Sequence, residues 1–518
     1  MEKQRILWAD DEIDLLRPHI LFLNDKGYET VTTNSGKDAL EIFKKELFDI
    51  VFLDENMPGL SGIETMLRIK SINSNIPVVL ITKSEEESIM EDAIGSQIAD
   101  YLIKPVNPNQ ILLSLKKNLD NKRLISEKTN TQYQQEFRQI GMMLGDRLGH
   151  AEWAELYKKL VYWELQLDKV RDESMSEILI QQKEEANRLF SKFVENNYFS
   201  WIKNPENNAP LMSQHVLKRR VIPMAETSDV PVFFILIDNL RFDQWKVIEP
   251  VISELFRVTE EDSYFSILPT ATQYARNSLF AGLMPADIEK MHPKWWVNDD
   301  DEGGKNLHEE DLLKDQISRL RKNIKSSYTK ITNLDAGKEL VDNIPNLFGN
   351  KLNVIVYNFV DMLSHARTDM QVIRELADDE PAYRSITLSW IEHSPLLEAL
   401  KRIAQKNVKL IITTDHGTIR VKEPSKIIGD RNTNTNLRYK QGKNLNYEKR
   451  DVFEVKNPND ALLPRLNVST AFVFAKQDKF FAYPNNFNYY VNHYRNTFQH
   501  GGISLEEMIV PFISLVNK

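Results

Sequence analysis

Residues 410 to 420 read LIITTDHGTIR, an apolar run that turns polar at residues 413 and 414 and then presents Asp415, His416 and Gly417. A strand buried on both faces of a parallel sheet is continuously apolar. Ligands of such open sheets bind just beyond the carboxyl ends of the strands. The segment therefore predicts a buried strand with a functional site at its end, although Asp and Gly also favour simple turns.

Length and composition limit what the chain can do. At 518 residues it is too long for one hydrophobic core, so we expect about two to four domains. It has no cysteine, which leaves His, Asp, Glu and hydroxyl groups as metal ligands. The net charge of −9 disfavours attraction of the whole chain to nucleic acid. No membrane span or signal peptide is recognisable, so we expect a cytoplasmic protein.

Residues 1 to 120 alternate apolar runs with amphipathic stretches, which predicts a doubly wound βα domain. Because they are apolar and short, five segments are expected to form its strands: residues 5–9, 28–33, 48–53, 76–82 and 100–104.

Charged side chains follow several of these strands. Asp10 and Asp11 come after the first strand and Asp54 after the third. Three carboxylates at one sheet edge repel one another unless a cation lies among them, and an all-oxygen cluster suits Mg²⁺. Thr82 and Lys104 end the fourth and fifth strands. A hydroxyl and an ammonium group are therefore expected at the same edge.

The motifs ADDE, LDENMPG and YLIKP, together with Thr82, resemble the receiver domain of two-component response regulators in order and spacing. The resemblance implies a CheY-like fold, a sensor histidine kinase as partner, and Asp54 as the residue that accepts the phosphoryl group. The magnesium and switch residues that it implies are Asp10, Asp11, Asn56, Thr82, Tyr101 and Lys104.

From residue 121 to residue 215 the strand signals stop and apolar residues recur three and four positions apart. This spacing is typical of amphipathic helices and predicts a small bundle of about three. We interpret its aromatic and methionine stripe as core. A helical spacer also suits the transmission of a rigid-body change.

A third domain is expected from residue 216 to residue 518. Its strand at PVFFILID ends at Asp238, and a strand through about residue 360 is followed by Asp361 and His365, which share a face if a helix follows. His500 precedes two glycines and another apolar run. Within PTATQYAR, Thr272 is expected at the start of a helix, whose free N–H groups suit a phosphate or an oxyanion.

Each of these residues alone has an ordinary explanation. His500 could be a core or surface histidine, and Thr272 could be a helix cap. Together, three Asp and three His with one hydroxyl could form two neighbouring metal sites of the kind used for phosphoryl transfer, with the ions about 3.5 to 4 Å apart.

The pattern resembles the alkaline phosphatase superfamily, and the whole chain resembles response regulators with a PglZ effector domain. The fold class implied is α/β, with a CheY-like receiver, a helical bundle linker and an alkaline-phosphatase-like effector domain. The resemblance also implies a role in type IX secretion and two Zn²⁺ ions per chain. One Zn²⁺ would be held by Asp361, His365 and His500, and the other by Asp238, Asp415, His416 and the Thr272 oxygen.

The expected chemistry follows from the proposed metal ligands. Metal coordination favours the alkoxide of a threonine, so Thr272 would attack phosphorus in line and form a covalent intermediate. Monoesterases of the superfamily commonly have a serine and an arginine near the nucleophile, whereas threonine is frequent in its phosphodiesterases. Arg276 lies four residues after Thr272, but its position alone assures no role in clamping phosphate. Threonine therefore favours diester substrates.

Residues 420 to 450 are rich in Lys, Arg and Asn and poor in apolar groups. They are either a solvated surface loop or a flexible basic flap over the site. In the second case Arg431, Arg438 and Lys440 would contact the phosphates of a nucleotide, and Tyr439 would offer a stacking face.

Three functions remain open. The leading interpretation is a two-Zn²⁺ phosphodiesterase for nucleotides or oligonucleotides, controlled by phosphorylation and forming a homodimer when phosphorylated. The second is a non-catalytic response regulator whose metal-stabilised third domain docks a sigma factor or a secretion component. Thr272 favours the enzyme, since a structural metal site has no need of a hydroxyl. A DNA-binding regulator fits least, because no helix-turn-helix is recognisable and the chain is acidic.

Overall fold

The computed structural model describes residues 3–73, 76–83, 98–170, 173–298, 304–369, 376–377, 379–430 and 433–518, without the side chains of residues 120–128, 173 and 365–369. The chain divides into two compact units, Met1–Gln135 and Glu136–Lys518. Each unit is described by itself.

The first unit contains a five-stranded parallel sheet in the order β2-β1-β3-β4-β5. Its strands are β1 (Arg5–Ala9), β2 (Glu29–Thr33), β3 (Ile50–Asp54), β4 (Val78–Thr82) and β5 (Asp100–Ile103). Among the residues described before the linker, the helices are α1 (Arg17–Asp25), α2 (Gly36–Phe43) and α3 (Gly62–Ile72). All five strands lie where the apolar runs predict them, and β3 and β4 are buried along their whole length.

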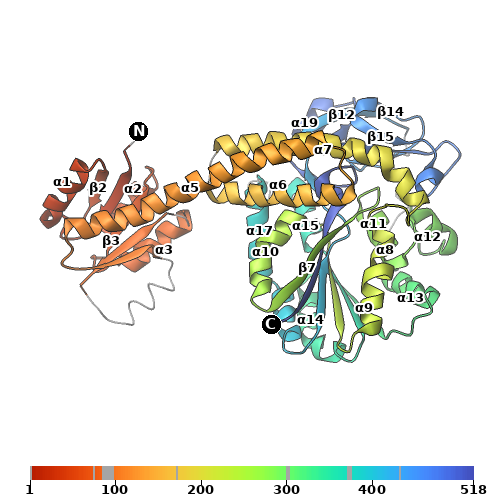
Figure 1. Cartoon of the computed structure of the whole chain (residues 1–518), viewed down its shortest axis with the longest axis horizontal. Helices are drawn as coiled ribbons and strands as arrows, with labels where there is room; N and C mark the ends of the chain where they lie inside the picture. The colour runs from red at the N-terminus through yellow and green to blue at the C-terminus, as the bar shows by residue number, and fades with distance from the viewer. Residues whose placement is uncertain are drawn as a thin grey trace. The chain divides into compact units, whose positions relative to one another are not determined.

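The linker is helical, as predicted. Helix α5 (Pro108–Gly145) begins in the first unit and ends in the second, and it is followed by α6 (His150–Val170) and α7 (Glu173–Lys203). Helices α6 and α7 pack side by side (Figure 1). The interpretation of the aromatic and methionine stripe as core is confirmed in part: Trp153, Tyr157 and Phe190 are buried, whereas Tyr162 and Met142 are exposed.

The rest of the second unit is built on a six-stranded sheet in the order β7-β19-β10-β6-β9-β8. Strands β10, β6, β9 and β8 are parallel, and β19 is antiparallel to both β10 and β7. The six strands are β6 (Val232–Ile237), β7 (Phe256–Phe265), β8 (Ser326–Ile331), β9 (Leu352–Tyr357), β10 (Lys409–Thr413) and β19 (Ile509–Asn517).

Helices cover this sheet (Figure 1). The described helices of the unit after the linker are α8 (Ser213–Val216), α9 (Ile222–Thr227), α10 (Phe242–Ser253), α11 (Thr272–Ala281), α12 (Pro285–Met291), α13 (Glu309–Arg319), α14 (Leu334–Leu347), α15 (Phe359–Asp369), α17 (Glu380–His393), α18 (Pro395–Ile403), α19 (Phe487–Tyr494) and α20 (Leu505–Met508). Of these, α19 packs on a smaller sheet, against the strand Lys479–Ala482.

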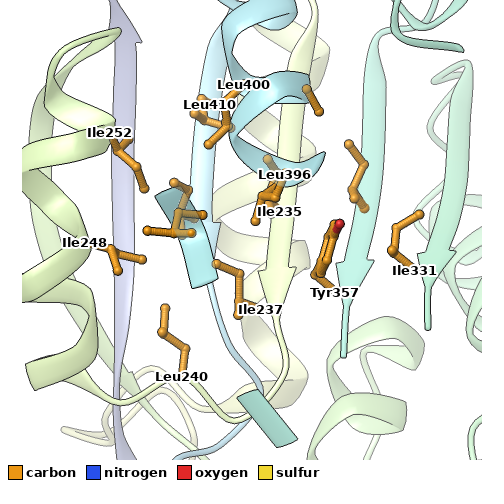
Figure 2. Packing of buried hydrophobic residues seen from close by; sticks show 14 of the residues in the cluster. Ile235, Ile237, Leu240, Ile248, Ile252, Ile331, Tyr357, Leu396, Leu400 and Leu410 are labelled. Atoms are coloured by element: carbon orange, nitrogen blue, oxygen red, sulfur yellow. The ribbon is translucent and has the colours of Figure 1, made fainter. Parts of the chain in front are cut away.

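The core lies between the sheet and its covering helices. Leu396 and Leu400 of α18 point toward Ile235 and Leu410 of the central strands (Figure 2). All four side chains are buried, and burial of each contributes about 1.5 to 3 kcal/mol relative to exposure. The continuous apolar sequence of β6, VFFILI, is what allows both of its faces to be covered.

The three central parallel strands end side by side. Thr413 of β10 pairs with Leu236 of β6, and Ile237 of β6 pairs with Tyr357 of β9. The residues that follow these strands therefore meet at one sheet edge. Strand β9 ends at Tyr357 rather than near residue 360, and helix α15 begins at Phe359, so Asp361 lies in the first turn of a helix.

The segment from 420 to 450 differs from both predictions made for it. It contains β12 (Glu423–Ile428), β13 (Tyr439–Gly442) and β14 (Asn446–Tyr447) in small sheets with β15 (Val452–Val455), β16 (Ala471–Ala475) and β17 (Lys479–Ala482). A further two-stranded pair joins β11 (Ile419–Arg420) to β18 (Phe498–Gln499). Pairing with the apolar sequence AFVFA of β16 buries β13 completely, so this part of the segment is not an open loop.

Candidate functional site

Three buried side chains meet at the edge formed by the central strands. Asp238 follows β6, and Asp415 and His416 follow β10. Each of the three offers one ligand atom, and these atoms all lie within 4.8 Å of one another. Nε2 of His416 is 4.0 Å from Oδ1 of Asp238 and 3.8 Å from Oδ2 of Asp415. This grouping of two carboxylates and one imidazole follows directly from the parallel pairing of β6 and β10.

Thr272 brings a hydroxyl to the same place. It is the first residue of α11, as predicted, and its Oγ1 lies 3.1 Å from Nε2 of His416. The first N–H groups of a helix have no partner within the helix and carry the positive end of its dipole. A negatively charged group bound beside Thr272 would therefore be stabilised.

A second pair of potential ligands adjoins the first set. Nε2 of His500 lies 3.7 Å from Oδ1 of Asp361. The rings of His416 and His500 stack with their centroids 4.3 Å apart, so the two sets are neighbours. His365, the remaining residue assigned to this set, lies outside the described side chains.

Backbone carbonyls orient both imidazoles. Nδ1 of His416 lies 3.2 Å from the Gly417 carbonyl oxygen, and Nδ1 of His500 lies 3.1 Å from that of Thr270. In each ring this leaves Nε2 facing the carboxylates. A carbonyl at the far ring nitrogen is the usual partner of a metal-binding histidine because it fixes the tautomer and the orientation of the ring.

Arg276 lies behind the two carboxylates and is fully buried. Its guanidinium group forms ion pairs with Oδ2 of Asp238 and, at 3.0 Å, with Oδ2 of Asp415. At its other end Nη1 is 3.5 Å from Glu309, which is also buried. Arg276 is therefore engaged by protein carboxylates, and the sequence alone did not reveal this role.

The charges within this cluster are not balanced. Burial raises the pKa of Asp238 well above its ordinary value, and Asp415 and Asp361 add to this, against the opposing effect of Arg276. Burial acts in the same direction on Asp415, but Arg276 and His416 outweigh it and hold the pKa of Asp415 to about 2. Two carboxylates this close repel each other, so added positive charge would stabilise the site.

The donor set fits a divalent metal ion. Oδ1 of Asp238 is buried and accepts no hydrogen bond from any described residue. A buried carboxylate oxygen without a partner is costly, and a cation at that point would remove the cost. Carboxylate oxygens with imidazole nitrogens are a normal ligand set for Zn²⁺. The residues present can therefore hold the metal that the superfamily resemblance implies.

The first unit, which resembles a receiver domain, contains a separate carboxylate cluster. Ligand atoms of Asp10, Asp11 and Asp54 lie within 4.8 Å of one another, which suits Mg²⁺. Nζ of Lys104 contacts both Asp54, at 2.8 Å, and Asp10, at 3.0 Å. Burial raises the pKa of Asp54 above its ordinary value, and Asp10 adds to this, whereas Lys104 opposes it.

The other expected receiver residues lie around this cluster. Thr82 ends β4, but its hydroxyl donates to the Glu55 carboxylate. Tyr101 of β5 is half-buried against the apolar core of the unit, and Asn56 is exposed. Lys104 and Pro105 are joined by a cis peptide bond, as is often found in the resembled family.

The basic residues expected to bind substrate differ from that expectation. Arg438 is fully buried and pairs with Glu507, with Nη2 at 2.6 Å from Oε2. Lys440 is also buried, and its Nζ donates to the Asn434 carbonyl at 2.7 Å. Both are taken up by internal contacts, Lys440 within the buried strand β13 and Arg438 directly before it. Arg431 lies outside the described residues.

Comparison with known protein families accounts for most of the chain. A family described as the BREX system PglZ alkaline phosphatase-like domain matches residues 216–515. The chain belongs to the PglZ family. A response regulator receiver domain matches residues 6–116, and a PorX response regulator linker domain matches residues 123–202. The three matches together give the architecture of a PorX-type response regulator with a PglZ effector domain.

Individual relatives such as the following match about a quarter of the chain. The alginate biosynthesis transcriptional regulatory protein AlgB of Pseudomonas syringae pv. tomato is 33% identical over 120 residues, which are 23% of this chain and 27% of that protein. The transcriptional regulatory protein ZraR of Klebsiella oxytoca is 35% identical over 123 residues, 24% of this chain and 28% of that protein. The chain thus spans little more than a quarter of these relatives.

Among solved structures, the chemotaxis protein CheY4 of Vibrio cholerae is 28% identical, with a TM-score of 0.22, over 23% of this chain and all of that chain. Among the described residues of the PglZ protein, no helix combines the length and the apolar character needed to cross a membrane.

Several residues that shape the PglZ site could not be found from the sequence. Glu309 lies in a polar stretch with no distinguishing spacing, and the position of Glu507 three residues after Ser504 indicates only a helix start. Asn239, directly after Asp238, adopts the left-handed backbone conformation with φ of 66°, and its N–H is 3.4 Å from Oδ1 of Asp415. Asn tolerates this conformation better than most residues, which is the one signal the sequence offered.

Proposed function

We propose that the PglZ unit, residues 216–518, is a two-zinc phosphodiesterase whose nucleophile is Thr272. The observation that carries the proposal is the convergence of the Thr272 hydroxyl, 3.1 Å from His416, with two buried carboxylates and a second His–Asp pair. A site that served only to stabilise the fold would need no hydroxyl at a helix N-terminus. Asp238, Asp415, His416 and Thr272 would hold one Zn²⁺, and Asp361, His365 and His500 the other.

The proposed reaction proceeds in two displacements. Bound zinc would lower the pKa of a hydroxyl and offset negative charge on the phosphoryl oxygens. The Thr272 oxygen, after losing its proton to water, forms a bond to phosphorus as the ester P–O bond breaks, and the departing alkoxide takes a proton from water. In the second displacement a water oxygen attacks the phosphothreonine, which releases the phosphate monoester and returns the threonine.

The engagement of Arg276 supports diesters as substrates. A monoester dianion carries one more negative charge than a diester, and superfamily monoesterases use an arginine beside the nucleophile to neutralise it. Here Arg276, four residues after Thr272, is buried between Asp238, Asp415 and Glu309 and is not free to take that role. Nucleotides and oligonucleotides are the diesters we propose, although Arg438 and Lys440 do not support a phosphate contact, because both are buried.

The receiver makes the chain a response regulator, and a receiver implies a sensor kinase as partner. We propose that phosphorylation of Asp54 controls the phosphodiesterase by promoting a homodimer, and that the protein works in the cytoplasm. The match to a PorX linker supports a role in type IX secretion, with a sigma factor as a further partner.

Replacement of Thr272 tests the catalytic proposal. Thr272→Val should lower diester turnover by at least a hundredfold, whereas Thr272→Ser should retain activity because it keeps the hydroxyl. Bis-aryl and mono-aryl phosphates, short oligonucleotides and cyclic dinucleotides serve as substrates, with zinc measured in each variant. Undiminished turnover by zinc-replete Thr272→Val would refute the covalent route. No hydrolysis of any ester by the wild type would favour the docking function.

A further inference from the structure

The linker helix α7 makes direct hydrogen bonds to the C-terminal part of the PglZ unit. Asn187 of α7 is buried, and its Nδ2 donates to Oε2 of Glu506 at 3.0 Å. Its Oδ1 accepts from the backbone N–H of Leu505 at 2.8 Å. The amide therefore fixes both the start of α20 and the side chain of its second residue.

Asn187 is the middle member of a row on one face of α7. Lys183 lies four residues before it and is 3.6 Å from Oε1 of Glu506. Ser191 lies four residues after it; its hydroxyl donates to the Asn187 carbonyl at 2.8 Å and contacts the Ile503 carbonyl oxygen at 3.4 Å. Residues four apart share a helix face, so successive turns of α7 contact one continuous segment, residues 503–506.

The next residue, Glu507, makes hydrogen bonds to the two loops that carry His416 and His500, the proposed histidine ligands of the metal site. The Gly417 N–H, next to His416, donates to the Glu507 carbonyl at 3.2 Å. The Gly502 N–H, two residues after His500, donates to Oε1 of Glu507 at 2.9 Å. Glu507 thus connects the loop of each proposed histidine ligand to α20.

There is no free space between α20 and the first of these loops. A Cβ placed on Gly417 would lie 2.1 Å from the Glu506 carbonyl oxygen, far inside van der Waals contact. The backbone of Glu506 therefore touches the residue that follows His416, and a shift of α20 must shift this loop as well.

From these contacts we propose that Asn187 is a positioning residue of the phosphodiesterase site, through which the linker helix sets the placement of His416 and His500. The inference rests on the proposed function for its catalytic consequence, but the structural connection from Asn187 to the two loops exists whether or not the site is catalytic. The PglZ site would thereby respond to displacement of α7.

The test reverses the hydrogen bond between Asn187 and Glu506. Asn187→Asp places two carboxylates against each other, whereas the double variant Asn187→Asp/Glu506→Gln restores one donor and one acceptor with their positions exchanged. Arg188→Ala is the matched control, because Arg188 is the next residue but is exposed and pairs with Glu185 within the same helix.

Hydrogen–deuterium exchange of the metal-free full chain gives a readout independent of catalysis. Asn187→Asp should accelerate exchange in peptides covering residues 413–420 and 498–508, and the double variant should restore protection. Diester kcat should fall about tenfold in Asn187→Asp with little change in KM, as is typical for residues that orient metal ligands, and recover in the double variant.

The outcomes separate this inference from the proposed function. Unchanged exchange at both peptides in Asn187→Asp would overturn the positioning role. A loss of protection from exchange that the double variant fails to restore would overturn it as well. Altered and rescued exchange in a protein that hydrolyses no ester would support the positioning role and refute the phosphodiesterase. Arg188→Ala should match the wild type in every measurement.

Discussion

Removal of Arg276 should make the stability of the PglZ unit depend on zinc. In Arg276→Met the guanidinium that now pairs with Asp238 and Asp415 is lost. Glu309 keeps Lys330 at 3.0 Å, so the uncompensated charge falls on the two proposed zinc ligands. Removing one partner from a buried ion pair costs about 3 to 5 kcal/mol. At about 2 °C per kcal/mol for a unit of this size, the melting temperature should fall by roughly 8 °C.

Zinc should recover a large part of this loss. A bound Zn²⁺ places positive charge between the same two carboxylates, so it takes over the electrostatic role of the arginine. With saturating Zn²⁺ the difference between Arg276→Met and the wild type should shrink to less than half of its value in chelator. Arg276→Lys keeps the positive charge but not the planar guanidinium group, so its melting temperature should lie between those of Arg276→Met and the wild type.

Tryptophan fluorescence during heating is a suitable assay, because Trp8 is the single tryptophan of residues 1–135 and the signal therefore reports mainly on the second unit. Arg219→Met is the control, since Arg219 forms an exposed pair with Glu206 and should change the melting temperature little. A metal-free Arg276→Met protein that melts within about 1 °C of the wild type would refute the reasoning. So would a difference that zinc leaves unchanged.

Three further predictions concern other parts of the chain. Burial lowers the pKa of Lys440 to about 7 in the folded protein, so between about pH 7 and 10.5 this side chain is protonated in the unfolded state but not in the folded state. Lys440→Met removes the cost of burying the charged amine. It should therefore stabilise the fold by a few kcal/mol at pH 6, with a gain that vanishes near pH 10.5 in denaturation curves. Gly417→Ala should destabilise by about 1 to 3 kcal/mol and weaken zinc binding in calorimetry, because its Cβ meets the Glu506 carbonyl; equal affinity would contradict this. Beryllofluoride with Mg²⁺ should raise the mass in light scattering from monomer to dimer for the wild type but not for Asp54→Ala, and an unchanged wild-type mass would disprove the dimer.

The sequence predicted the strands of the receiver sheet, the central strands of the second sheet and the polar residues at their ends, because these features depend on local patterns. Continuous apolar runs marked β6 and β10, and polar residues directly after them placed Asp238 and Asp415 at one edge. Thr272 was recognised because a helix start has its own local signals. Such features need only a few neighbouring residues to be identified.

Contacts between distant residues could not be predicted in this way. The pair formed by Arg276 and Asp415 joins residues far apart in the chain, and no spacing indicates which carboxylate a given arginine meets. The burial of Arg438 depends on Glu507 in the same manner. The polar composition of residues 420 to 450 suggested a loop, but pairing with β16 decided the structure of β13. Tertiary pairing overrides local propensity where partners lie elsewhere in the chain.

The position of β19 in the second sheet has a consequence for biosynthesis. This strand, residues Ile509–Asn517, lies between β7 and β10, so two strands made much earlier remain unjoined until it leaves the ribosome. At a synthesis rate of roughly 5 to 20 residues per second, the interval between β7 and β19 lasts tens of seconds. The receiver unit is complete well before this, whereas β7 and β10 wait for the strand that joins them. We therefore expect nascent chains of this protein to depend on chaperones during that interval, and chains interrupted before residue 509 to have a folded receiver without a folded effector.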